Sequence, residues 1–209
     1  MRISGVLKAV AVVALSILAF VPASEANQIT IGGSAQNITF TGNGTLVSVS
    51  ITSLTGSAFY DSDPLGSYSF GPVSFTAGPN VAEQYAAGAN TESFTFTSPD
   101  GDSLTANIHW NFIQDNTTKP KFFGTYTVVS SSGDAAFLLD FPVGRSGDID
   151  FTTNALSTGG TLDQLVAAHA TGTATISSGE LVGVPEPSSL MLLGTALVGL
   201  GAFARRRRK

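Results

Sequence analysis

The chain has 209 residues, no cysteine and a formal net charge of −5 at pH 7. The lack of cysteine excludes disulfides, a thiol nucleophile, a cysteine-ligated metal and lipid attachment through cysteine. Residues 27–181 are more acidic than the whole, with three basic and thirteen acidic residues and a formal net charge of −10. Such a surface repels nucleic acid and anionic lipid, so nucleic-acid binding is excluded.

The N-terminal segment has the three parts of a secretory signal peptide. Basic residues precede the apolar run at residues 9–21, and the small residues Ser24 and Ala26 follow it. A membrane anchor is the alternative, but the run is shorter than the roughly 20 residues that cross a bilayer. We therefore predict a signal peptide at residues 1–26, cleaved after Ala26, and export of the rest.

Residues 27–181 are expected to form one all-β domain. Apolar and polar residues alternate along short runs, and segments such as DSDPLG, AGPN and SPDGD separate them with turn-forming residues. Asn43-Gly44 between two runs predicts a hairpin with a type I′ turn. The runs lie at residues 38–41, 47–52, 67–75, 92–97, 103–112, 121–129, 135–141, 148–152 and 171–177. About eight to ten strands spaced in this way predict a single antiparallel β-sandwich or a barrel-like fold.

One segment, Thr161–Ala170, favours a short helix over a further strand. Thr161 and Gln164 have the spacing of a capping box, and Gly172 is placed to end the helix. A strand remains the alternative, because the segment is short.

The strand expected at residues 103–112 carries a polar stripe. Alternation sends Trp110 and Phe112 to the core face and Asn107, His109 and Asn111 to the other face. The stripe is a candidate glycan contact through hydrogen bonds; the wet face of a half-buried strand is the alternative. The chain has no nucleophile elbow, zinc-protease helix or phosphate loop, so we expect no catalytic residue and no enzyme activity.

Three Asp-x-Asp pairs are candidates for Ca²⁺ because hard carboxylate oxygens suit that ion. None continues into a twelve-residue calcium loop, and Asp beside Gly, Ser or Pro is common in turns. We therefore expect no cofactor and no metal, with Ca²⁺ kept open as an alternative. The candidate ligands are Asp61, Asp63, Asp100, Asp102, Asp148 and Asp150.

The C-terminal tail joins three features. The motif Val184-Pro185-Glu186-Pro187 precedes a charge-free apolar run at residues 188–204, and a basic terminus follows. The run has the minimum length of a transmembrane helix, and the positive-inside rule keeps the basic end in the cytoplasm. The two prolines hold the motif extended at the outer face of the inner membrane. An ordinary single-span anchor is the alternative. The basic residues are Arg205, Arg206, Arg207, Arg208 and Lys209.

This order of features resembles the PEP-CTERM protein-sorting domain of Gram-negative bacteria. In that family an integral-membrane exosortase, a cysteine-dependent transpeptidase-like enzyme, recognises the Pro-Glu-Pro motif and removes the tail. The resemblance implies that residues 182–209 form the sorting tail, with recognition at 184–187, a transmembrane segment at 188–204 and a basic stop at 205–209. It covers the tail together with the expected signal peptide, and it does not extend to residues 27–181.

The family is linked to exopolysaccharide and the biofilm matrix. The resemblance therefore implies an exosortase as partner, a transient inner-membrane anchor, and delivery to the cell surface or extracellular matrix. We expect a structural or adhesive protein of the cell envelope, with exopolysaccharide as a further partner. A secreted glycan-binding or glycan-processing β-sandwich domain is the alternative.

Overall fold

The computed structural model describes residues 28–61, 65–115 and 118–183. They belong to one compact unit that runs from Ala26 to Gly183. The expected signal peptide, the calcium candidate Asp63 and the sorting tail from residue 184 onward lie outside the described residues. Val182 and Gly183, which the sequence assigned to the tail, instead end the last strand of the domain. Within the described ranges, no helix has the length and apolar character needed to cross a membrane.

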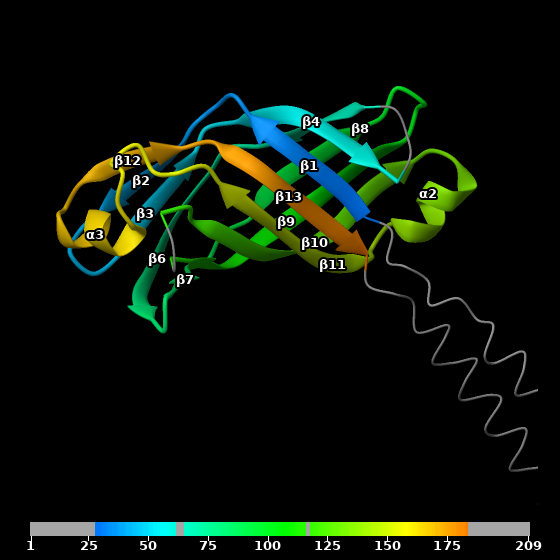
Figure 1. Cartoon of the computed structure of the whole chain (residues 1–209). Coiled ribbons are helices and arrows are strands. Elements are labelled where there is room, and N and C mark those ends of the chain that lie inside the picture. The colour runs from blue at the N-terminus through cyan, green and yellow to red at the C-terminus, as the bar shows by residue number, and fades with distance from the viewer. Residues whose placement is uncertain (1–27, 62–64, 116–117, 184–209) are drawn as a thin grey trace, which may run out of the picture. The chain divides into compact units, whose positions relative to one another are not determined.

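Eight strands form a closed barrel in which every neighbouring pair is antiparallel (Figure 1). The all-β prediction is confirmed, in its barrel-like form. Around the barrel the strands are β1 (Gln28–Ser34), β4 (Leu54–Tyr60), β5 (Gly66–Phe70), β8 (Glu92–Thr97), β9 (Ser103–Gln114), β10 (Lys121–Ser132), β11 (Ser146–Thr153) and β13 (Ile176–Gly183), which returns to β1.

The long strand β9 links the barrel to a second antiparallel sheet. Its first half pairs with β8 and its last residues pair with β7, from which the second sheet continues. The added strands, in spatial order, are β7 (Gln84–Ala87), β6 (Val73–Val81), β3 (Val47–Ile51), β2 (Ile38–Gly42) and β12 (Thr171–Ala174). Two short helices among the described residues, α2 (Ala135–Asp140) and α3 (Leu162–Ala167), lie at opposite ends of the domain formed by the two sheets (Figure 1).

Aromatic side chains fill the barrel. The predicted core residue Trp110 is fully buried, with its ring centroid 5.0 Å from that of Phe151 and 5.6 Å from that of Phe122. Phe122 and Phe151 stack at 4.4 Å. Each fully buried side chain of this size contributes about 1.5–3 kcal/mol relative to an exposed one. The inward positions of alternating strands therefore supply most of the stabilising burial.

The β2–β3 hairpin is confirmed, but its turn is not of type I′. Gly42 pairs with Val47, so four residues form the loop instead of two. The N–H of Asn43 donates to the carbonyl of Leu46 at 3.1 Å, and the Asn43 side chain accepts from the N–H of Leu46 at 2.8 Å. The Asn side chain thus closes the turn, in place of a positive φ at Asn43.

The predicted capping box of α3 is confirmed, because Thr161 accepts from the N–H of Gln164 while the Gln164 side chain accepts from the N–H of Thr161. The helix stops before Gly172, and His169 takes the left-handed conformation with φ 52°.

The strand expected at residues 135–141 is wrong. There, Asp134 caps α2 by accepting from the N–H of Phe137 at 2.8 Å.

Candidate functional site

A β-bulge in β9 turns Phe112 to the outer surface. Trp110 lies opposite Gly124 and Phe112 opposite Phe123, so Asn111 is an extra residue in the ladder. One inserted residue reverses the alternation of faces beyond it. Phe112 therefore leaves the core face on which alternation placed it, and it stacks on Phe123 with ring centroids 4.7 Å apart.

The stacked pair begins a row of side chains across four strands. Phe123 on β10 lies opposite Asp150 on β11, and Asp150 lies opposite Glu180 on β13. Neighbouring strands are about 4.8 Å apart, so side chains in one row lie within contact range of the next. Lys121, two residues before Phe123 on β10, reaches this row from the neighbouring one, with its Nζ 3.1 Å from Asp150 Oδ2 and 4.7 Å from the Phe123 ring centroid.

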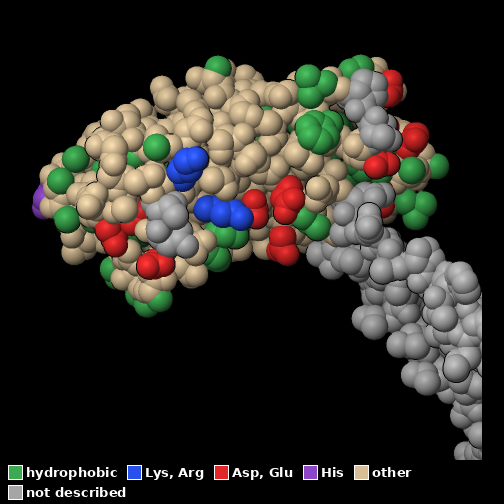
Figure 2. All heavy atoms as spheres, viewed as in Figure 1, with side chains coloured by type: hydrophobic (Ala, Val, Ile, Leu, Met, Phe, Trp, Pro, Cys, Tyr) green, Lys and Arg blue, Asp and Glu red, His purple; other side chains and the backbone are tan. Residues whose placement is uncertain are grey.

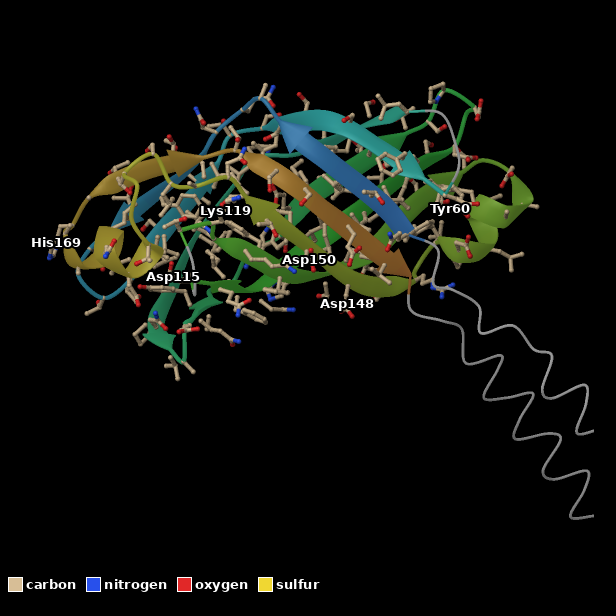
Figure 3. The ribbon with its side chains drawn as sticks, viewed as in Figure 1. Tyr60, Asp115, Lys119, Asp148, Asp150 and His169 are labelled. Atoms are coloured by element: carbon tan, nitrogen blue, oxygen red, sulfur yellow. The ribbon has the colours of Figure 1, made fainter. Side chains whose placement is uncertain are left out.

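The row from Phe112 to Glu180 lines an open groove of about 410 Å³ on the outer face of the barrel. Figure 2 shows the acidic side chains gathered on this face with basic side chains beside them, and Figure 3 shows Asp148 and Asp150 projecting outward from β11. A flat aromatic surface beside hydrogen-bond acceptors fits a polar ligand that has one apolar face. The lining residues are Asn111, Phe112, Phe123, Gly124, Asp148, Ile149, Asp150, Glu180 and Val182.

The groove joins two predicted candidate sets that are far apart in sequence. The stripe residues Asn107, His109 and Asn111 are all exposed on β9. Thr125 on β10 lies opposite both His109 and Asp148, so the stripe and the third Asp pair share one face. Asn111 lines the groove, whereas His109 bonds through Nδ1 to the Asn90 carbonyl at 2.8 Å.

The other Asp pairs lie elsewhere. Asp102 is buried, and its Oδ1 accepts from the N–H of Asp134 at 2.9 Å, which fixes the start of α2. Asp61 and Asp100 are exposed in loops. Among the residues described here, no three His, Asp or Glu side chains converge on a possible metal position. Calcium binding at Asp148 and Asp150 stays the untested alternative to the expectation of no metal.

Glu92 is a buried carboxyl group that the strand pattern did not single out. It is 1 % exposed, and its Oε2 accepts from Trp110 Nε1 at 2.7 Å. Burial raises the pKa of Glu92 to about 8, against the opposing effect of the Trp110 hydrogen bond. The signal in the sequence is its position two residues before Phe94, on the inward side of the ESFTFT run. Glu92 is therefore protonated in much of the folded population at neutral pH.

Two carboxylates, Asp115 and Asp163, join α3 to the sheets. Asp115 accepts from the N–H groups of Leu162 and Asp163, each at 2.6 Å. Asp163 accepts from the Tyr85 hydroxyl and from Asn80 Nδ2. Burial raises the pKa of Asp115 to about 6, while its two backbone hydrogen bonds lower it. These groups hold α3 in place, and none of them lines the groove.

Comparison with known proteins identifies the tail. Residues 183–209 match the family model of the PEP-CTERM protein-sorting motif. No curated protein and no solved structure matches the chain. The match lies outside the described residues apart from Gly183, and the barrel has no match of its own. The chain is therefore an exosortase-targeted, exported protein that carries a membrane-anchored PEP-CTERM sorting signal at its C-terminus.

Proposed function

We propose that the barrel is the non-enzymatic cargo of the sorting signal, a structural or adhesive protein of the cell surface or extracellular matrix. The observation that carries this is the family match of residues 183–209, because a sorting signal delivers the domain to which it is attached. The acidic, Ser- and Thr-rich surface of residues 27–181 suits a hydrated matrix. Exopolysaccharide is the partner that this role implies.

The tail is tested by the intact mass of the protein recovered from its native host. We expect loss of residues 1–26 and a cut near Pro185–Pro187, and extra mass at the new C-terminus would indicate covalent attachment to an envelope molecule. In a strain without the processing enzyme the tail should stay through Lys209.

A Glu186→Ala variant should also keep the tail, whereas the matched Glu180→Ala variant outside the motif should be cut normally. Retention of residues 184–209 in every strain and variant would contradict the sorting role. The protein would then be an ordinary membrane-anchored barrel.

Glycan binding is a second candidate, and the groove favours it. The Phe112–Phe123 pair offers a stacking surface for the apolar face of a sugar ring, and Asp150 and Glu180 accept hydrogen bonds from hydroxyl groups beside it. Asn111 adds an amide that can donate and accept. This arrangement is concave and aromatic, unlike a flat wet strand face.

The second candidate is tested by the retention of the processed protein on polysaccharide from the native host. Phe123→Ala should abolish retention, because it removes half of the stacked pair. Phe59→Ala is a matched control, since Phe59 is also a partly exposed phenylalanine, 39 % exposed, outside the groove. Equal retention of the two variants would show that the groove is not the glycan-binding site.

A further inference from the structure

The exposed large hydrophobic side chains gather at one end of the barrel. Of the seven among the described residues, six belong to the end of β4, the loop that follows it, the last third of β10, α2 and the loop after α2. Figure 2 shows apolar side chains at this end, where Figure 1 places α2. The seventh, Val81, lies at the β6–β7 turn. The six are Phe59, Leu65, Val129, Leu138, Leu139 and Val143.

The fold holds this apolar end in place. Helix α2 turns Phe137 inward against Tyr60, with ring centroids 5.0 Å apart, and leaves Leu138 and Leu139 outside. The Asp134 cap fixes the start of the helix, and Arg145 Nη1 donates to the Leu139 carbonyl at 3.2 Å. Leu139 is 64 % exposed as a result of this packing. The exposed leucines are therefore presented by a short helix that is hydrogen-bonded at both ends.

Both ends of the described chain emerge at this apolar end. Gln28 at the start of β1 pairs with Val182 near the end of β13, and the Tyr126 hydroxyl donates to the Val182 carbonyl at 3.3 Å. The Tyr126 ring in turn lies 6.4 Å from that of Phe141, which directly follows α2. The chain thus enters and leaves the barrel beside α2.

The sorting tail begins within a few residues of this point. The apolar run of the tail starts at Ser188, five residues after Gly183. Five residues of fully extended chain span at most about 18 Å. A tail anchored in a membrane is therefore a short tether for the barrel, and a short tether gives a local concentration in the millimolar range.

We propose that the apolar end around α2 docks on the zwitterionic headgroup region of the membrane that holds the sorting tail. Leu138, Leu139 and Val143 insert among the headgroups and upper acyl chains. The proposal rests on the membrane-anchored sorting signal and is independent of the matrix role proposed above.

Charge selects zwitterionic lipid as the partner. The exposed acidic residues Asp61, Asp100 and Asp134 flank the apolar end. They repel anionic headgroups, and the barrel domain as a whole carries excess negative charge. Apolar insertion held by a short tether therefore supplies the attraction, without a basic patch.

The test uses the full-length chain reconstituted in phosphatidylcholine vesicles at less than one chain per vesicle. The chain has no cysteine, so a single Leu139→Cys substitution carries one polarity-sensitive fluorophore. Val81→Cys is the matched control, because Val81 is a 70 % exposed aliphatic residue away from α2. We expect blue-shifted emission at position 139, with several-fold stronger quenching by shallow lipid-borne quenchers than at position 81.

A loss-of-function pair completes the design. With the fluorophore at Val143→Cys, the double variant Leu138→Ser/Leu139→Ser should lose the quenching, while Val81→Ser should keep it. Emission of the single, buried Trp110 reports that each variant is folded. Adding phosphatidylglycerol should weaken the quenching at low salt, and added salt should restore it.

Three results would overturn the proposal. The first is equal, water-like emission at positions 139 and 81. The second is a signal that appears only above one chain per vesicle, which would assign the apolar end to contact between copies. The third is a blue shift at position 139 that appears only when the processing enzyme is added, which would assign the apolar end to contact with that enzyme. The vesicles contain neither enzyme nor polysaccharide unless added, so failure here leaves the proposed function untouched.

Discussion

Trp110 and Glu92 form a hydrogen bond inside the barrel, with Trp110 Nε1 donating to Glu92 Oε2 at 2.7 Å. The other carboxyl oxygen, Oε1, is buried without a hydrogen-bond partner among the described residues. A buried carboxylate with one donor is costly, so the neutral acid is favoured and the pKa of Glu92 rises to about 8. The barrel therefore contains a titratable group in its core.

We predict that the processed protein loses stability as the pH rises from about 5 to 8. The pKa of Glu92 is about 8 in the folded protein, against the ordinary value of 4.5 that applies to the unfolded chain. The preference of the fold for the neutral acid therefore contributes fully to the free energy of unfolding below pH 4.5. That contribution to the free energy of unfolding is lost progressively as the pH rises from 4.5 through 8, about 5 kcal/mol in all. Urea unfolding at pH 5, 6, 7 and 8 measures the free energy of unfolding directly.

Glu92→Gln is the matched variant, because an amide oxygen still accepts from Trp110 and does not titrate. The free energy of unfolding of this variant should change much less with pH over the same range. Asp115, with its pKa raised to about 6, adds a smaller slope of the same sign to both proteins. Parallel pH profiles for the two proteins would falsify the assignment of the slope to Glu92.

We predict that Asp115→Ala loosens α3 from the sheets. The carboxylate accepts from the Leu162 and Asp163 N–H groups at 2.6 Å, and the variant leaves both donors without it. The loss is about 1–3 kcal/mol. Hydrogen exchange should quicken at those two amides before the barrel strands open. Asp148→Ala, on the exposed outer face, should leave both amides unchanged; equal effects from the two substitutions would contradict the capping role.

Alternating patterns predicted much of the barrel. The runs at residues 92–97 and 103–112 became β8 and most of β9, and the Thr161–Gln164 capping box became the start of α3. These elements are specified locally, by the alternation of faces or by one side chain closing on nearby backbone. The strands β1, β4 and β7 carry glycine, alanine or serine at several positions, and the runs used for the prediction passed over them.

The groove could not be predicted because it depends on pairing between distant strands. The bulge at Asn111 appears only in the register of β9 against β10, and without it Phe112 belongs to the core face. The meeting of the Asn107–Asn111 stripe with Asp148 and Asp150 also requires β10 to lie between β9 and β11. The apolar pattern of residues 135–141 fits a buried strand, but residues 135–140 form α2, whose first turn is stabilised by the Asp134 cap.

We predict that Gly124→Ala destabilises the barrel beside the bulge. A Cβ at Gly124 would lie 2.7 Å from the His109 carbonyl oxygen and 2.8 Å from Trp110 Cε3, which is closer than packed atoms allow. Overpacking of this kind costs about 1–3 kcal/mol. Thermal unfolding should show the loss. Gly71→Ala is the control, since its nearest contact would be an ordinary 3.4 Å; a larger loss for Gly71→Ala would contradict the argument.

The Lys121 ammonium group lies 3.1 Å from Asp150, which lines the groove, although Lys121 itself does not belong to the lining. Its ion pair with Asp150 is partly exposed on both sides, so Lys121→Ala should change the free energy of unfolding by less than about 1 kcal/mol. The same variant uncovers the Phe123 ring and leaves Asp150 without its cation. If the groove binds a glycan, retention on native polysaccharide should change for Lys121→Ala while stability does not. Lys119→Ala removes the same charge two residues earlier and is the control for charge alone. Identical retention of the two variants and the parent protein would count against a ligand at this face.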